Sequence, residues 1–169
     1  MPESQVPAQE NGREALARRA LSIAEALARA TRGEKAEARR MDASGAPVFW
    51  RQVARLAIAP HEEARWMQFA RLVALMTPSS RETSIHGPVK LGAALARAGF
   101  SEQRLARLMA ARGQAREEAL ERAIRMLARK TDTLDVPDLA GVIFWPETSR
   151  LARSYYIETE QLPAEESQG

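Results

Sequence analysis

Three arginines recur at helical spacing in the second half of the chain and could together bind phosphate groups. Arg122, Arg125 and Arg129 stand at i, i+3 and i+7, so a helix places them on one face. The opposite face is apolar and consists of Leu120, Ile124 and Leu127. Each guanidinium is a permanently charged fork of donors that fits two phosphate oxygens. The row therefore predicts a helix that packs through its apolar face and presents arginines to a nucleic-acid backbone.

The acidic residues of the same helix offer a second interpretation of this row. Glu118 and Glu121 stand four residues before Arg122 and Arg125, and such pairs stabilise an ordinary solvated helix. For any single arginine this interpretation is the better one. Phosphate binding is favoured for the whole set, because residues 87–116 of the neighbouring helices contain few acids.

A tight corner in the segment VKLGAALARAGFSEQRLARLM, residues 89–109, carries four more bases. Gly99 stands where a helix end requires left-handed backbone, and Ser101 stands where the next helix needs an oxygen to cap its first N–H groups. Leucines repeat at helical spacing on both sides of the corner, with Met109 beside the last of them, which predicts one buried stripe per helix. Two short helices should therefore hold the bases in fixed positions. These bases are Lys90, Arg97, Arg104 and Arg107.

The residue types that most enzymes need are scarce in this chain. It contains two histidines, His61 and His86, and no cysteine. Neither histidine stands in a metal-ligand spacing such as H-E-x-x-H. The sequence has no phosphate loop, no dinucleotide-binding fingerprint and no nucleophile elbow. We therefore expect no enzymatic activity, no metal site and no cofactor.

Charge is distributed unevenly along the chain. The formal net charge is +3, but residues 1–12 and 158–169 contain six acids and no base, which leaves residues 13–157 with +9. A basic body of this kind is typical of a protein that binds a polyanion. The longest apolar run, residues 140–146, is far shorter than the ~20 residues that a membrane span needs. We expect a cytoplasmic protein that makes no contact with a membrane.

The patterned segments have helical periodicity, and none alternates apolar and polar residues as a strand does. The sequence predicts an all-α fold, a compact bundle of about eight or nine helices without a sheet. Expected helices cover residues 13–31, 34–41 and 115–130, and prolines begin or separate others at Pro47, Pro60, Pro137 and Pro146. One helical domain is expected over residues 13–157. The acidic tails, residues 1–12 and 158–169, are expected to be disordered.

Several motifs follow one another in an informative order. They are FWRQVARL, LVALM, VKLGAALARAGFSEQRLARLMAA, LDVPDLAGVIFW and SRLARSYY. This order resembles the CasB family, the small subunit of the type I-E CRISPR surveillance complex Cascade. The resemblance implies an all-helical, non-catalytic protein, two copies of which pack head to tail beside the large subunit and the backbone subunits. It also implies contacts with the guide RNA and the target strand, and a basic surface that binds the displaced DNA strand and stabilises the R-loop.

The resemblance further implies positions for the nucleic-acid-binding surface. Arg39 and Arg40 match a pair of arginines before the FWRQV helix, whereas Arg104 and Arg125 match bases of the corner and of the helix after it. Arg150 matches a base of the last helix, although Pro146 departs from the pattern of the family. Helical spacing adds five more bases, namely Lys90, Arg97, Arg107, Arg122 and Arg129.

Two other functions agree with the same residues. The segment ALARAGFSEQRLARL, residues 94–108, resembles a helix-turn-helix, which would make the protein a regulator that binds duplex DNA. In that alignment Leu95 falls where a small residue is usual, and Gln103 is the only amide of the second helix. Alternatively, the protein is a helical adaptor whose arginines bind acidic protein partners.

Overall fold

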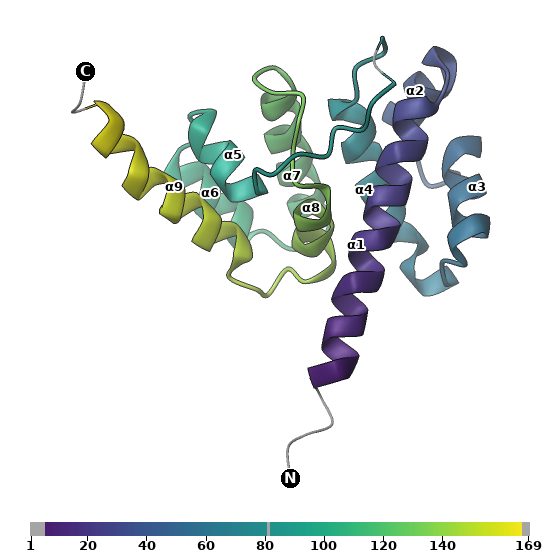
Figure 1. Ribbon diagram of the computed structural model, residues 1–169, viewed down its shortest axis with the longest axis horizontal. Coiled ribbons are helices and arrows are strands. Elements are labelled where there is room, and N and C mark those ends of the chain that lie inside the picture. The colour runs from purple at the N-terminus through teal and green to yellow at the C-terminus, as the bar shows by residue number, and fades with distance from the viewer. Residues whose placement is uncertain (1–5, 81, 167–169) are drawn as a thin grey trace.

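A computed structural model describes residues 6–80 and 82–166 of the chain. The predicted all-α fold is confirmed, because this part of the chain forms nine α-helices and one 3₁₀ turn and contains no strand (Figure 1). The elements are α1 (Val6–Arg29), α2 (Arg32–Arg39), α3 (Pro47–Leu56), η1 (Pro60–Glu62), α4 (Glu63–Met76), α5 (Leu91–Arg97), α6 (Glu102–Ala110), α7 (Gly113–Ala128), α8 (Val136–Phe144) and α9 (Arg150–Glu166). No helix among the described residues is long and apolar enough to cross a membrane.

The first helix contacts helices from both halves of the chain. α1 packs against α8 as well as against α3 and α4 (Figure 1). Its inward face is apolar, and the side chains of Leu16, Ala20, Ile23 and Leu27 are buried there. Trp66 and Phe69 of α4 are fully buried, with their rings edge to face at a centroid distance of 5.4 Å. α4 also packs against α7, so a continuous core joins the two halves.

The second half of the chain is built on a close contact between α5 and α9. Gly92 allows this contact, because a Cβ atom there would collide with the Leu151 carbonyl oxygen and with Ser154 Oγ. The Tyr155 hydroxyl is buried in the same region and donates a hydrogen bond to the Phe100 carbonyl at 2.5 Å. α9 is therefore held in a fixed position along α5, and the bases of the two helices keep a fixed relation.

The corner between α5 and α6 forms as the sequence predicts. Gly99 has a φ of 82°, in the left-handed region. Ser101 Oγ accepts a hydrogen bond from the Arg104 N–H at 3.2 Å and caps α6. The leucines of both stripes are buried, but Met109, which was expected among them, is 38% exposed. It does not pack inward because it lines a surface hollow beside Trp145.

The helices at both ends of the chain are longer than expected. α1 begins at Val6 rather than at Arg13, and α9 continues to Glu166 rather than ending near Ile157. Glutamates, glutamines and alanines in both segments favour continuation of a helix, and the expected disorder of the two acidic tails stays a prediction. The remaining tail residues, 1–5 and 167–169, lie outside the described residues.

Candidate nucleic-acid interface

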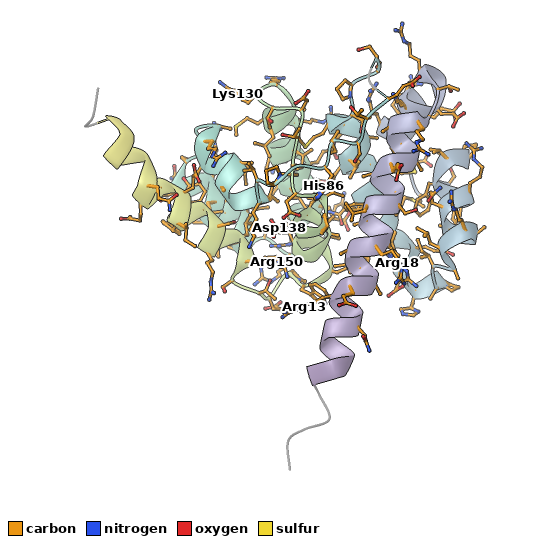
Figure 2. All side chains as sticks on the ribbon, viewed as in Figure 1. Arg13, Arg18, His86, Lys130, Asp138 and Arg150 are labelled. Atoms are coloured by element: carbon orange, nitrogen blue, oxygen red, sulfur yellow. The ribbon has the colours of Figure 1, made fainter. Side chains whose placement is uncertain are left out.

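A groove of about 860 Å³ lies where the first part of α1, the start of α5 and the first half of α9 meet. It brings together three of the predicted bases, Lys90, Arg97 and Arg150. Two further bases line it, Arg13 from α1 and Arg153 from α9. Figure 2 shows Arg13 and Arg150 on the same face of the molecule. The groove thus gathers five bases that are spread over most of the sequence.

Two carboxylates, Asp138 and Glu158, are the acids among the described residues that line the groove. Each forms an ion pair with one of its arginines. The five bases therefore leave an excess of positive charge, which favours a ligand with several negative charges. The Ser149 hydroxyl also lies in the wall and is a further donor for phosphate or sugar oxygens. The hydroxyls of Thr148 and Ser154 line the groove too, but they donate to the Trp145 and Arg150 carbonyls.

Arg150 is fixed by contacts between α8 and α9. Its Nη1 donates a hydrogen bond to Asp138 Oδ1 at 3.3 Å, and Figure 2 shows the two residues close together. Its Cζ lies 5.4 Å from the centroid of the Trp145 ring. Gly141 provides the space, since a Cβ atom there would lie 2.6 Å from Arg150 Cζ. The side chain is 28% exposed. Arg150 therefore stabilises the groove and offers only part of its guanidinium to a ligand.

Asp138 is the buried acid of this site. Its Oδ2 accepts the backbone N–H of Leu91 at 2.9 Å, at the first residue of α5. Its own N–H donates to Asp135, which caps α8. Burial raises the pKa of Asp138 above its usual value, against the opposing effects of the Leu91 hydrogen bond and the Arg150 charge. The carboxyl group thus joins the starts of α5 and α9 to the start of α8 and orients Arg150.

The other acid forms a two-point ion pair at the end of α5. Glu158 Oε1 lies 2.6 Å from Arg97 Nε, and Glu158 Oε2 lies 3.4 Å from Arg97 Nη2. The Glu158 side chain is 13% exposed, whereas that of Arg97 is 54% exposed. A phosphate that approaches Arg97 must therefore compete with an internal carboxylate.

Predicted bases on α6 and α7 form a second basic area, which we call the α6–α7 surface. It consists of Arg104, Arg107, Arg122, Arg125 and Arg129. All five are exposed, and α6 packs against α7. Arg125 pairs with Glu121 at 2.9 Å, and Glu121 also pairs with Arg71 of α4. In the described part of the chain the side chains of the other four have no ion pair, so their charge is available to a ligand.

Arg39 and Arg40 lie apart from these two areas. Arg39 is the last residue of α2 and Arg40 follows it, toward the end of the molecule opposite α9 (Figure 1). Arg39 donates to the carbonyls of Ala74 and Thr77 at 3.0 and 2.6 Å and thereby caps the end of α4. Arg40 is exposed beside two acids, Glu37 and Asp42. The structure does not bring this pair to the groove, and the hydrogen bonds of Arg39 account for an arginine at that position.

Sequence reasoning missed Arg13 and Arg153. Arg153 stands three residues after Arg150 in the predicted last helix, so the helical spacing used elsewhere could have found it. No local pattern indicates Arg13, because its place in the groove depends on the packing of α1 against α8. The two histidines lie elsewhere. His61 is exposed in η1, and His86 Nδ1 accepts the Val136 N–H at 3.3 Å. No group of three or more metal-ligating side chains occurs among the described residues.

The helix-turn-helix interpretation can be compared with the packing of the corner. α5 packs mainly against α9, and α6 packs against α7. In a helix-turn-helix the first helix positions the second one in the major groove. Here each helix of the corner has a different partner, so the packing does not favour this alternative.

Comparison with known proteins agrees with the motifs. The sequence matches the family described as CRISPR-associated protein Cse2 over residues 26–156. The match covers α2 to α8, the last turn of α1 and the first half of α9. No curated protein and no solved structure matches the chain. CasB and Cse2 are two names for the same small subunit of the type I-E Cascade, so the match agrees with the resemblance found in the sequence. Because the match spans most of the sequence, the chain belongs to the Cse2 family of CRISPR-associated proteins.

Proposed function

We propose that this protein is a non-catalytic small subunit of Cascade that binds the displaced DNA strand through its sugar–phosphate backbone and thereby stabilises the R-loop. The observation that carries this proposal is the groove lined by Arg13, Lys90, Arg97, Arg150 and Arg153. Five bases in one concave surface are typical of proteins that follow a single strand without reading its sequence. The α6–α7 surface offers further bases for the same strand.

The energetics of R-loop formation explain why such weak, sequence-independent contacts are sufficient. In RNA-guided complexes, pairing with the guide supplies the sequence specificity, and exchange of one duplex for another is nearly balanced in free energy. Contacts with the displaced backbone then shift the balance toward the open state. Within the complex, tethering raises the effective concentration of the strand at the groove, so a weak binding surface becomes effective.

The partners follow from the same assignment. We propose that the protein packs as a head-to-tail pair of copies in the complex, next to the large subunit and the backbone subunits. It contacts the guide RNA and the target strand there. Outside the groove and the α6–α7 surface, Arg40 is an exposed base for these contacts, whereas Arg39 is held by the carbonyls at the end of α4.

The decisive experiment removes two bases of the groove in the assembled complex. Lys90→Gln with Arg153→Gln should shorten the lifetime of the R-loop and lower the slope of log affinity against log salt by about 1.4, because each phosphate contact on a single strand contributes ~0.7. The control is Arg32→Gln with Arg55→Gln. These exposed arginines lie on α2 and α3, at the opposite end of the molecule from α9, and their loss should have little effect.

Three results would contradict the proposal. If the groove substitutions and the control substitutions shortened the R-loop lifetime equally, net charge would be responsible and the groove would not. An unchanged R-loop lifetime in the groove variant, with loss of binding to another subunit, would favour the acidic-partner adaptor. Preference of the isolated protein for one duplex sequence over random duplex would favour the helix-turn-helix regulator.

A further inference from the structure

A second hollow, of about 290 Å³, adjoins the groove and shares Thr148, Ser149 and Arg150 with it. It lies where the end of α6, the start of α7 and the end of α8 meet α9. Arg150 is the member of the predicted nucleic-acid-binding set that lines this hollow. Because Arg150 lines both hollows, a chain that occupies the groove can continue into this hollow without leaving the surface.

Apolar side chains line this hollow beside its arginines. Met109, Val142 and Trp145 line it, and Met109 is exposed although its place in the leucine stripe predicts burial. Trp145 is half-buried, at the end of α8. Methionine sulfur and an indole ring are favourable neighbours for a flat aromatic group. A volume near 300 Å³ is at the lower end for small-ligand sites, a size that suits one nucleobase.

Two further arginines at this hollow are held by backbone carbonyls. Arg112 Nη1 donates to the Met109 and Ala111 carbonyls at 2.6 and 2.9 Å. Arg116 donates from Nη1 to the Leu108 carbonyl and from Nη2 to the Val142 carbonyl, both at 3.3 Å. The carbonyls fix both guanidinium groups at the ends of α6 and α8, and the remaining N–H groups point to no acceptor within the described residues.

The charge of these two arginines is only partly balanced. Burial lowers the pKa of Arg116, and the neighbouring charge of Arg112 lowers it further, whereas Glu147 acts in the opposite direction. Glu147 is exposed, and it is the acid that lines this hollow in the described part of the chain. Arg150 adds a third guanidinium, whose Nε is buried without a hydrogen-bond partner. An anion at the rim would reduce the repulsion among these groups.

We propose that this hollow takes one unstacked base of single-stranded DNA. Arg112 and Arg116 bind the phosphate on one side of that base, and Lys90 and Arg153 of the adjoining groove bind the phosphates on the other side. The proposal rests on the proposed function. It extends that function because the protein then binds a base of the displaced strand as well as its sugar–phosphate backbone. It assigns roles in binding to Met109, Arg112, Arg116 and Trp145, which the predicted set of site residues omits.

The experiment is an abasic scan of the displaced strand in R-loops formed by the assembled complex. Guide pairing fixes the register, so each position of the strand meets a fixed part of the protein. Abasic nucleotides at discrete positions should shorten the R-loop lifetime about fivefold or more, since base–aromatic stacking is worth a factor of this order. In complexes with Trp145→Leu the same abasic positions should have no additional effect. Trp50→Leu, on the exposed tryptophan of α3, is the matched control and should leave the pattern unchanged.

A second measurement uses the unaltered protein, so its result does not depend on whether the Trp145 variant folds. The base analogue 2-aminopurine is quenched by its stacked neighbours in the duplex, so it should brighten when the strand is displaced. At the sensitive position, where the base contacts the indole ring of Trp145, the gain in fluorescence should be smaller than at neighbouring positions. A flat abasic scan in a complex whose R-loop still requires Lys90 and Arg153 would overturn the base site and leave the proposed function standing. If the R-loop lifetime is also insensitive to Lys90 and Arg153, the proposed function itself fails.

Discussion

Asp138 orients Arg150 and holds the first residue of α5, although its negative charge is the wrong sign to bind a phosphate. It accepts the Leu91 N–H at 2.9 Å and the Arg150 guanidinium at 3.3 Å, and it is 5% exposed. A buried N–H without an acceptor destabilises a fold more than the same N–H in water. The side chain is therefore a positioning residue for both walls of the groove.

Truncation of the Asp138 side chain should lower the free energy of unfolding more than neutralisation of its charge. Asp138→Ala leaves the Leu91 N–H and Arg150 without a partner and should lower the free energy of unfolding by about 1–3 kcal/mol. Asp138→Asn keeps an oxygen acceptor for Leu91 and should lower it by roughly 1 kcal/mol or less. Urea denaturation at neutral pH measures both values. Equal losses for the two variants would show that the charge, and not the hydrogen bond to Leu91, is what matters.

The pH dependence of stability provides a separate test of the burial of Asp138. Burial raises the pKa of this carboxyl in the folded protein. Its contribution to the free energy of unfolding is therefore largest below the unfolded pKa of about 3.9 and declines as pH rises through the folded pKa. Asp138→Asn has no such group, so the stability of the natural protein relative to this variant should fall as pH rises across the acid range. A constant difference would mean that the pKa is unshifted.

Local residue roles could be predicted, but long-range roles could not. Gly99 and Ser101 were identified because a helix end and a helix start require those residue types within a few positions. Arg39 was assigned to nucleic acid, but its hydrogen-bond acceptors lie 35 and 38 residues away at the end of α4. No pattern in the sequence indicates which arginines have internal partners, because those partners are brought close only by the packing of helices.

At the scale of elements, the α5–α9 contact sets the width of the groove. The contact requires Gly92, since a Cβ atom at this position would lie 2.7 Å from the Tyr155 nitrogen and closer to two oxygens of α9. Gly92→Ala should force α9 away from α5, lower the free energy of unfolding by about 1–3 kcal/mol and weaken binding of single-stranded DNA. Denaturation and DNA titration of the same preparations test this result.

The control for Gly92 is Gly33 in α2. A Cβ atom at Gly33 meets one side-chain oxygen at 4.0 Å, so Gly33→Ala should be neutral or slightly stabilising. A Gly92 variant with natural stability and natural DNA affinity would show that the two helices can separate without affecting the groove.

The continuation of α9 beyond the Cse2 match places an acid against a base of the groove. Glu158 neutralises part of the charge of Arg97 through contacts of 2.6 and 3.4 Å. Glu158→Gln should therefore raise the affinity of the isolated protein for single-stranded DNA by roughly two- to fivefold, the range expected for one partly exposed charge pair. Glu160→Gln removes an equal charge from the same helix outside the groove and should change the affinity less. Equal gains would indicate a general effect of net charge.

Periodicity predicted the helices well, but it could not predict the surfaces between them. The apolar stripes of the corner helices and of α7 were identified because each repeats within one helix. The groove was not, because it is formed by residues from α1, the loop before α5 and the first half of α9. The three bases found there were identified as members of separate helices, and their convergence depends on the contacts of α1 with α8 and of α5 with α9.

For the whole molecule, the question is whether the displaced strand follows one basic area or two. The groove and the α6–α7 surface are separate sets of bases. The hollow beside Trp145 lies between them, because Arg112 and Arg116 belong to the junction of α6 and α7 while Arg150 also lines the groove. This arrangement favours a single continuous path from Arg97 through the hollow to Arg104 and Arg107.

Salt dependence can distinguish the two cases in the assembled complex. Lys90→Gln with Arg153→Gln should lower the slope of log R-loop stability against log salt by about 1.4, and Arg104→Gln with Arg107→Gln should lower it by a similar amount. On one continuous path all four phosphates are contacted at once, so the four substitutions together should lower the slope by about 2.8. A slope that does not respond to Arg104 and Arg107 would restrict the strand to the groove and leave the α6–α7 surface for the guide RNA or another subunit.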